Sequence, residues 1–126
     1  MSSHKGKSMA YPVEQIINVV TNISSGGLRN ANFGVGMIFA ENGEQAVLSG
    51  YPGMFAFSLG VEQVTCQREW AESDRPRLLR LAEAAMERGV MPDYDPREPW
   101  FLCYSHTDAD VDRTLEVYSE IVRTVT

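Results

Sequence analysis

The sequence is short of cysteine, of basic residues relative to acidic ones, and of long apolar runs. Two cysteines in 126 residues are too few for a disulfide scaffold, so we expect free thiols in a reducing compartment. No apolar run is long enough to span a bilayer, and the first residues lack the apolar stretch of a signal peptide. We therefore expect a cytoplasmic protein that has no membrane partner.

The charge balance argues against nucleic acid as a partner. Eleven Lys and Arg face 17 Asp and Glu, which gives a net charge of −6. An acidic chain repels the phosphate backbone, so nucleic-acid binding is not expected. What is present is ordinary for a single globular domain: 126 residues, of which 44% are hydrophobic and 22% charged.

The first 44 residues are predicted to be partly helical. Apolar residues at Val13, Ile16, Ile17 and Val20 mark one helical face, although their β-branched side chains also suit a strand. The stretch 24–27 is a clear break. Residues 28–42 are ambiguous, and their end at Gly43 is typical of a helix C-terminus.

From residue 45 onward the pattern becomes regular. Short strands are predicted at 45–49 and 54–59, and a third at 100–104, while helices are predicted to begin at the caps Asp74 and Thr107. This order predicts an α+β fold: a small three-stranded, mainly antiparallel sheet covered by helices on one face. Domain assignment follows the same division, with an N-terminal segment at 1–44 and a compact domain at 45–126.

Few residues stand out as chemically active. His106 follows a predicted strand and is a candidate acid or base, or else a structural residue of the strand-to-helix corner. Cys103 and His106 have metal-like spacing but give only two ligands, so no metal is expected. A buried structural thiol is the favoured reading of Cys103. Arg97 and Glu98 lie between prolines before the third strand, where either a functional pair or a solvated salt pair is consistent with the sequence.

Three segments carry a resemblance to a known family. They are the run 48–57, the run Glu87-Arg-Gly-Val-Met-Pro, and above all Arg97-Glu-Pro-Trp-Phe-Leu-Cys-Tyr-Ser-His-Thr-Asp-Ala-Asp-Val-Asp-Arg-Thr-Leu. From about Gln45 to Val122 the chain resembles the C-terminal small domain of class III pyridoxal-phosphate-dependent aminotransferases, closest to the glutamate-1-semialdehyde aminomutase type. Less specifically, Gly6-Lys7-Ser-Met-Ala10 with Tyr11-Pro12 is similar to the segment around that family's cofactor lysine.

The resemblance implies roles for particular residues. Lys7 would be the lysine that holds pyridoxal phosphate as an imine, and Glu98 would face the substrate. Arg97 is adjacent to Glu98 and could contact a carboxylate, but the resemblance gives it no role of its own. His106 and Thr107 would form a structural corner. The sequence lacks the glycine-rich phosphate loop and the other cofactor contacts that the family places before its lysine, so this chain alone is not expected to hold the cofactor.

Two readings of function follow, in different classes. In the first, the chain is part of an aminotransferase-type enzyme, as a truncated or split polypeptide. Its partners would be a complementary large domain or a second copy, and its substrates a small-molecule amino donor and acceptor. In the second, it is a non-catalytic α+β interaction or dimerisation module. An orphan domain of this kind would also be prone to self-association through apolar residues that a large domain would otherwise cover, with these candidates: Met54, Phe55, Phe57, Trp70 and Trp100.

Overall fold

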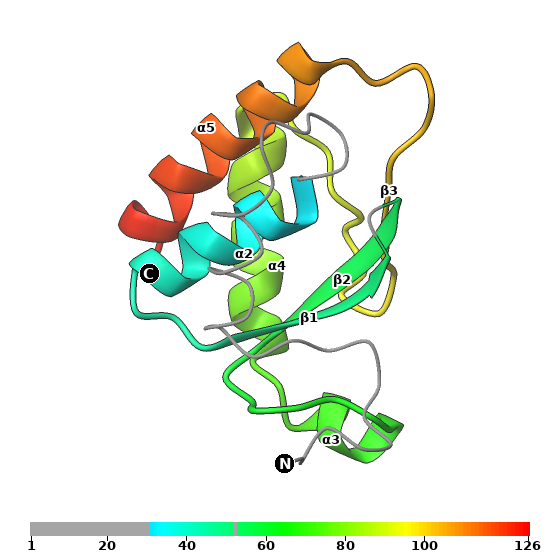
Figure 1. Cartoon of the computed structure of the whole chain (residues 1–126). Helices are drawn as coiled ribbons and strands as arrows, with labels where there is room; N and C mark the ends of the chain where they lie inside the picture. Colours follow the sequence, from blue (N-terminus) through cyan, green and yellow to red (C-terminus); the bar gives the residue numbers. More distant parts are fainter. Residues whose placement is uncertain (1–30, 52) are drawn as a thin grey trace.

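A computed structural model describes residues 31–51 and 53–126, with the side chain of Phe33 left out. The predicted helix around Val13–Val20 therefore lies outside the described residues. Figure 1 shows helices on one side of a small sheet. The elements follow in chain order: α2 (Ala31–Glu41), β1 (Ala46–Tyr51), β2 (Met54–Leu59), α3 (Gln67–Ala71), α4 (Arg75–Glu87), β3 (Trp100–Phe101) and α5 (Asp108–Thr124).

The sheet is antiparallel throughout, with the strand order β1-β2-β3. Leu48 pairs with Phe57 across β1 and β2, and Phe55 of β2 pairs with Trp100 of β3. Because side chains alternate along a strand, these positions share the face that turns toward the helices. The expected three-stranded α+β fold is confirmed.

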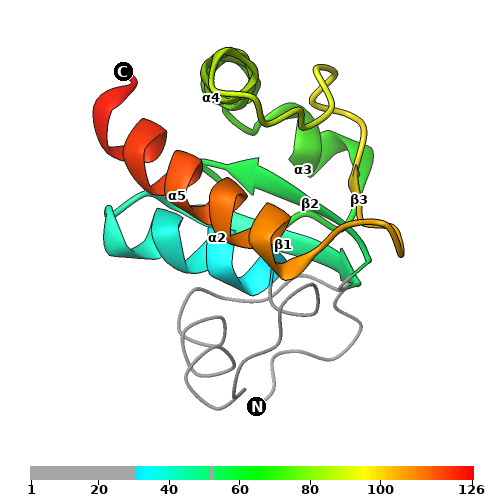
Figure 2. The same cartoon turned by 90° about the horizontal axis from the view of Figure 1, so that it is seen from above.

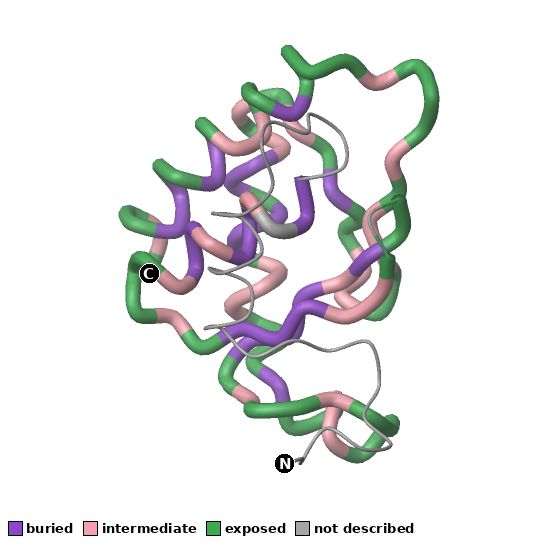
Figure 3. Tube along the Cα trace, viewed as in Figure 1, coloured by how far each residue is buried: buried purple, intermediate pink, exposed green. Residues whose placement is uncertain are grey.

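The helices form a layer over that face. α2 packs on β1, α4 packs on β2, and α5 packs on both α2 and α4. Seen from above, α5 and α2 run alongside each other while α4 is viewed end-on (Figure 2). The buried positions lie where these helices face the sheet (Figure 3). The core thus draws on α2 as well as on residues 46–124, and the division at residue 44 stays a prediction.

Two predicted helix caps are confirmed. The Asp74 carboxylate accepts a hydrogen bond from the Arg77 backbone N–H at 3.0 Å, which starts α4. At the start of α5, the Thr107 hydroxyl accepts from the Asp110 N–H, while the Asp110 carboxylate accepts from the Thr107 N–H at 2.7 Å. Such reciprocal bonds satisfy backbone donors that a helix start leaves unpaired.

The Arg77 side chain connects the end of α5 to the rest of the helical layer through one ion pair and two hydrogen-bonded carbonyls. The largely buried guanidinium of Arg77 lies 3.1 Å from the Glu44 carboxylate and also donates to the carbonyls of Val122 and Val125. The last carbonyls of a helix have no partner within it, so this side chain satisfies groups that would otherwise depend on water. One arginine thereby connects α4, α5 and the turn after α2.

The sequence prediction is wrong at two points in the loops, and no element is predicted where α3 lies. β3 has only two residues, because the chain turns after Leu102 and forms local hydrogen bonds in place of further strand pairing. Cys103 consequently lies beyond the strand and is exposed, not a buried thiol. The short helix α3 falls in a segment where the sequence has little periodicity.

Gly50 is predicted to be required for the β1–β2 hairpin. Its φ is +113°, and an added Cβ would overlap the Met54 carbonyl oxygen and lie 2.9 Å from the Phe55 Cα. We expect Gly50→Ala to lower the free energy of unfolding by about 2–4 kcal/mol in urea titrations. Gly53→Ala, which meets nothing within 4 Å and has no positive φ, is the control and should change stability by less than about 0.5 kcal/mol. Equal losses in both variants would contradict this account of the hairpin.

Candidate functional site

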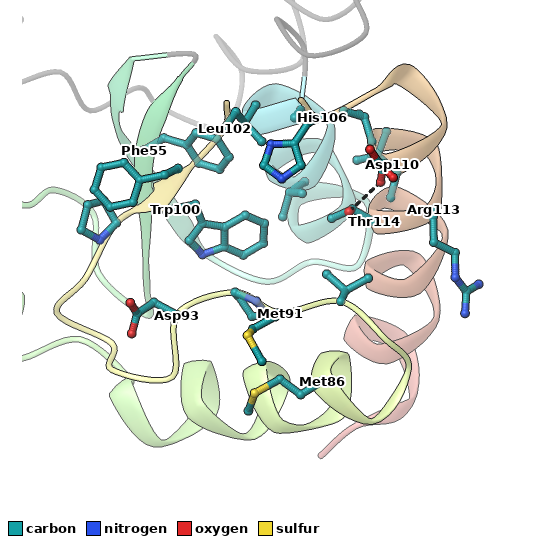
Figure 4. Close-up of a pocket in the computed structure, with 18 of the residues that line it drawn as sticks. Phe55, Met86, Met91, Asp93, Trp100, Leu102, His106, Asp110, Arg113 and Thr114 are labelled. Carbon is teal, nitrogen blue, oxygen red and sulfur yellow. Dashed lines mark hydrogen bonds between the residues drawn. The ribbon is translucent and has the colours of Figure 1, made fainter. Parts of the chain in front are cut away.

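A cavity of about 650 Å³ opens at the start of α5. Its walls come from the first turns of α5 and α2, the end of α4 with the loop behind it, and β2 and β3. Figure 4 shows the Trp100 ring facing into this space, with Met86 and Met91 on the α4 side. Apolar atoms dominate the lining, as is usual for sites that bind small molecules.

His106 is the predicted site residue that the structure places at this cavity. The Cys103 backbone N–H donates to the imidazole Nδ1 at 2.9 Å, and the His106 N–H donates back to the Cys103 carbonyl at 3.1 Å. The cysteine–histidine spacing that resembled a metal motif therefore builds a tight turn. Because Nδ1 accepts a hydrogen bond, a neutral imidazole carries its proton on Nε2.

Thr107 and Asp110 form the next layer of this corner. Hydrogen bonds from the Thr107 backbone N–H and hydroxyl hold the pKa of the Asp110 carboxyl below its usual value, with a smaller contribution from His106. The negative charge also lies in the first turn of α5, where the helix dipole favours it. The structure therefore places His106 and Thr107 next to each other at the turn before α5, and their role as a structural corner stays a prediction.

Arg97 and Glu98 do not line the cavity. Arg97 borders a shallow recess with Trp70 and Cys66, and its guanidinium is bound to Asp95 at 2.6 Å. Hydrogen bonds from the Arg97 side chain and backbone lower the pKa of Asp95 from 3.8 to about 2. The exposed Glu98 lies two residues before β3, and its role toward a substrate stays a prediction.

Other predicted features fall outside what the structure describes or are absent from the described part. Lys7 lies outside the described residues, so its proposed role stays a prediction. Among residues 31–51 and 53–126, no three His, Cys, Asp or Glu side chains are grouped so that they could hold a metal ion. Within the same residues, no helix is both long and apolar enough to cross a membrane.

Sequence reasoning missed the cavity itself. Its walls come from segments far apart in the chain, from Ala31 to Leu115, and each apolar residue separately reads as ordinary core. The sequence signal for this part of the cavity wall is the set of three prolines at 92, 96 and 99, because they keep the loop from pairing as a strand.

Three curated relatives of this chain carry the same enzyme name. The chain is 28% identical over 86 residues to a glutamate-1-semialdehyde 2,1-aminomutase of Methanopyrus kandleri. It is 33% and 32% identical to proteins of the same name from Delftia acidovorans and Ignicoccus hospitalis, over 73 and 72 residues. The matches suggest a relationship to class III aminotransferases. No family model matches the chain.

The matched region is a minor part of each relative. It covers 68% of this chain at most but only 17–20% of the length of these curated proteins. A relationship to the aminotransferase family is therefore supported for one portion of the enzyme, and the activity of the whole relative does not follow from it.

The described residues do not fit pyridoxal phosphate by themselves. Residues 31–126 contain no lysine, and an imine with the cofactor requires one. The cofactor also needs a phosphate cradle and a partner for its ring nitrogen, held close to that lysine. The cavity offers mainly apolar walls in their place. No catalytic step through the cofactor can be assigned to these residues.

Loss of the Thr107 cap is predicted to destabilise α5. We expect Thr107→Ala to lower the free energy of unfolding by about 1 kcal/mol, because the Asp110 N–H loses its acceptor. The control is Thr124→Ala, in which a hydroxyl bonded to the Glu120 carbonyl is removed from the other end of the helix. That change should stay within about 0.5 kcal/mol. A thermal melt in which Thr107→Ala is unchanged would place the helix start elsewhere.

The Asp95 carboxyl is predicted to titrate unusually low. Its folded pKa of about 2 lies below the ordinary 3.8, so the stabilisation it provides is present above that ordinary value. This stabilisation is lost as the pH falls through the folded pKa. We expect Arg97→Gln to raise the pKa of Asp95 toward 3.8 in a carboxyl NMR titration. Arg113→Gln, which removes a guanidinium paired with Glu116, should leave it in place.

Proposed function

We propose that residues 45–126 act as the C-terminal small domain of a class III aminotransferase-type enzyme. In this role the domain covers the substrate, excludes water and is completed by a large domain that brings pyridoxal phosphate. The proposal rests chiefly on the 28–33% identity to three aminomutases over 72–86 residues. Glu98 is the residue of this chain that would face the substrate, and the enzyme would transfer an amino group.

The geometry around Glu98 supports this assignment. Its backbone N–H donates to the Asp95 carbonyl at 2.9 Å, while two residues later Trp100 packs into the core. An exposed carboxylate thus projects from a short segment that is held at both ends. Such a side chain can meet a partner domain or substrate without a large rearrangement of its backbone.

A second function, an interaction module without chemistry, has an observation of its own. Tyr51, Met54 and Phe101 are register partners across the three strands, and their side chains are 55%, 44% and 62% exposed. This exposed row lies on the sheet face opposite Phe55 and Trp100. An apolar row in solvent favours contact with another protein surface, whether a large domain or a second copy.

A domain graft distinguishes the two functions. Residues 31–126, which include α2 because its side chains belong to the core, replace the corresponding C-terminal portion of the Methanopyrus kandleri aminomutase. Aminomutase activity is measured after the graft has been shown to fold and hold pyridoxal phosphate. We expect activity above background, and a loss of about tenfold or more in kcat/KM in the Glu98→Gln graft. Glu116→Gln, which changes an exposed carboxylate on α5, is the matched control and should be neutral.

The results of this experiment distinguish the small-domain proposal from the interaction module. A folded, cofactor-loaded graft without activity would contradict the small-domain proposal and leave the interaction module as the better account. An active graft in which Glu98→Gln and Glu116→Gln behave alike would keep the domain assignment and overturn the role of Glu98.

A further inference from the structure

The cavity at the start of α5 has the size of a ligand site. Its volume of about 650 Å³ falls inside the range of roughly 300–1,000 Å³ that small-molecule pockets occupy. It is also far larger than the space of about 30 Å³ that one water molecule takes. Water in so apolar a space would have few polar partners, so an apolar molecule would displace it favourably.

The walls suit a flat ring. The Trp100 ring faces the cavity, and Met86 and Met91 lie on the α4 side (Figure 4). Aromatic rings pack well on one another in offset or edge-on geometry, and methionine side chains adjust to the shape of what they contact. Leu102 and Leu115 complete the apolar lining.

Most polar groups at the cavity are already bonded within the protein. The Asp110 carboxylate accepts from Thr107, the Thr114 hydroxyl donates to the Asp110 carbonyl at 2.8 Å, and the Tyr94 hydroxyl donates to Glu83 at 3.1 Å. A ligand would have to break a bond to use any of them. They therefore contribute little to recognition.

Two N–H donors are exceptions among the described residues: the Trp100 indole, which faces the cavity, and the His106 imidazole, which is fixed by a second hydrogen bond. Its Nδ1 accepts the Cys103 N–H, so the neutral ring presents Nε2–H as a donor of fixed position. In Figure 4 the imidazole lies at the cavity close to Leu102, on the same wall as Trp100. The described part of the chain gives this Nε2–H no acceptor, so one acceptor atom on a ligand would form the hydrogen bond that it lacks.

Charge decides between a neutral and an ionised ligand. The carboxylates of Asp93 and Asp110 both line the cavity, and the opposing guanidinium of Arg113 extends away from it and is paired with Glu116. An anion would meet two like charges at the mouth of the cavity, which weakens its binding. We propose that this cavity binds a small neutral aromatic molecule whose single carbonyl oxygen accepts a hydrogen bond from His106 Nε2–H.

The proposal is tested by NMR titration of the full chain with three matched probes. Acetophenone has the ring and the carbonyl, ethylbenzene has the same shape without the acceptor, and benzoate adds a negative charge. We expect acetophenone to shift the Trp100 indole N–H saturably, with a dissociation constant on the order of millimolar for so few atoms. Trp70 does not line the cavity and serves as the internal control.

Both other probes should bind more weakly, by about two- to tenfold, since one hydrogen bond or one repulsion is at stake. In His106→Phe, acetophenone should lose its advantage over ethylbenzene. Val90→Phe fills the cavity and should abolish the shift, while Val61→Phe adds the same ring outside it and should not. Thermal melts establish whether each variant folds. If Val90→Phe does not fold, the comparison of acetophenone with ethylbenzene in His106→Phe tests the proposal without it.

Three results would overturn the proposal. The first is that acetophenone causes no saturable shift at Trp100. The second is that ethylbenzene or benzoate binds as tightly as acetophenone. The third is that His106→Phe still binds acetophenone more tightly than ethylbenzene. The outcome is independent of the aminotransferase proposal, because none of these probes requires pyridoxal phosphate or a large domain.

Discussion

The packing of Trp100 between the sheet and α5 is the contact on which the functional region depends. β3 has only two residues, too few for backbone pairing alone to hold a strand in place. The indole of Trp100 holds the strand in place through contacts with three other rings. Its ring centroid lies 5.4 Å from that of Phe55, 5.8 Å from that of Phe57 and 5.2 Å from that of Tyr118. Aromatic contacts of this kind add directional stability to the burial of a large apolar side chain.

Both candidate sites are positioned by that anchor. Glu98 lies two residues before Trp100, and His106 lies six residues after it, at the end of a turn closed by Cys103. The cap of Thr107 and Asp110 then fixes where α5 begins. Local hydrogen bonds therefore set the geometry on one side of the indole, while the Asp95–Arg97 pair sets it on the other. The same short segment carries the exposed carboxylate and the donor at the cavity.

Local signals made the regular elements predictable from sequence. Helix caps at Asp74 and Thr107, the helix end at Gly43 and the short strands predicted at 45–49 and 54–59 all led to elements that the structure contains. The end of β3 was not predictable, because the Cys103–His106 turn competes with strand pairing and has no strong sequence signature. The cavity could not be predicted either, since it arises from contacts between distant segments. The resemblance to aminotransferases came from residue motifs, and the comparisons support it only at the level of the family.

The residues that the structure describes do not form a cofactor site by themselves, because they contain no lysine and the cavity has mainly apolar walls. The most direct test is to incubate the purified chain with pyridoxal phosphate, reduce with borohydride and locate adducts by peptide mass spectrometry. The account predicts scattered, substoichiometric labelling of Lys5, Lys7 and the N-terminal amine. A saturable single adduct at Lys7 would contradict it, because the chain would then build a cofactor site of its own.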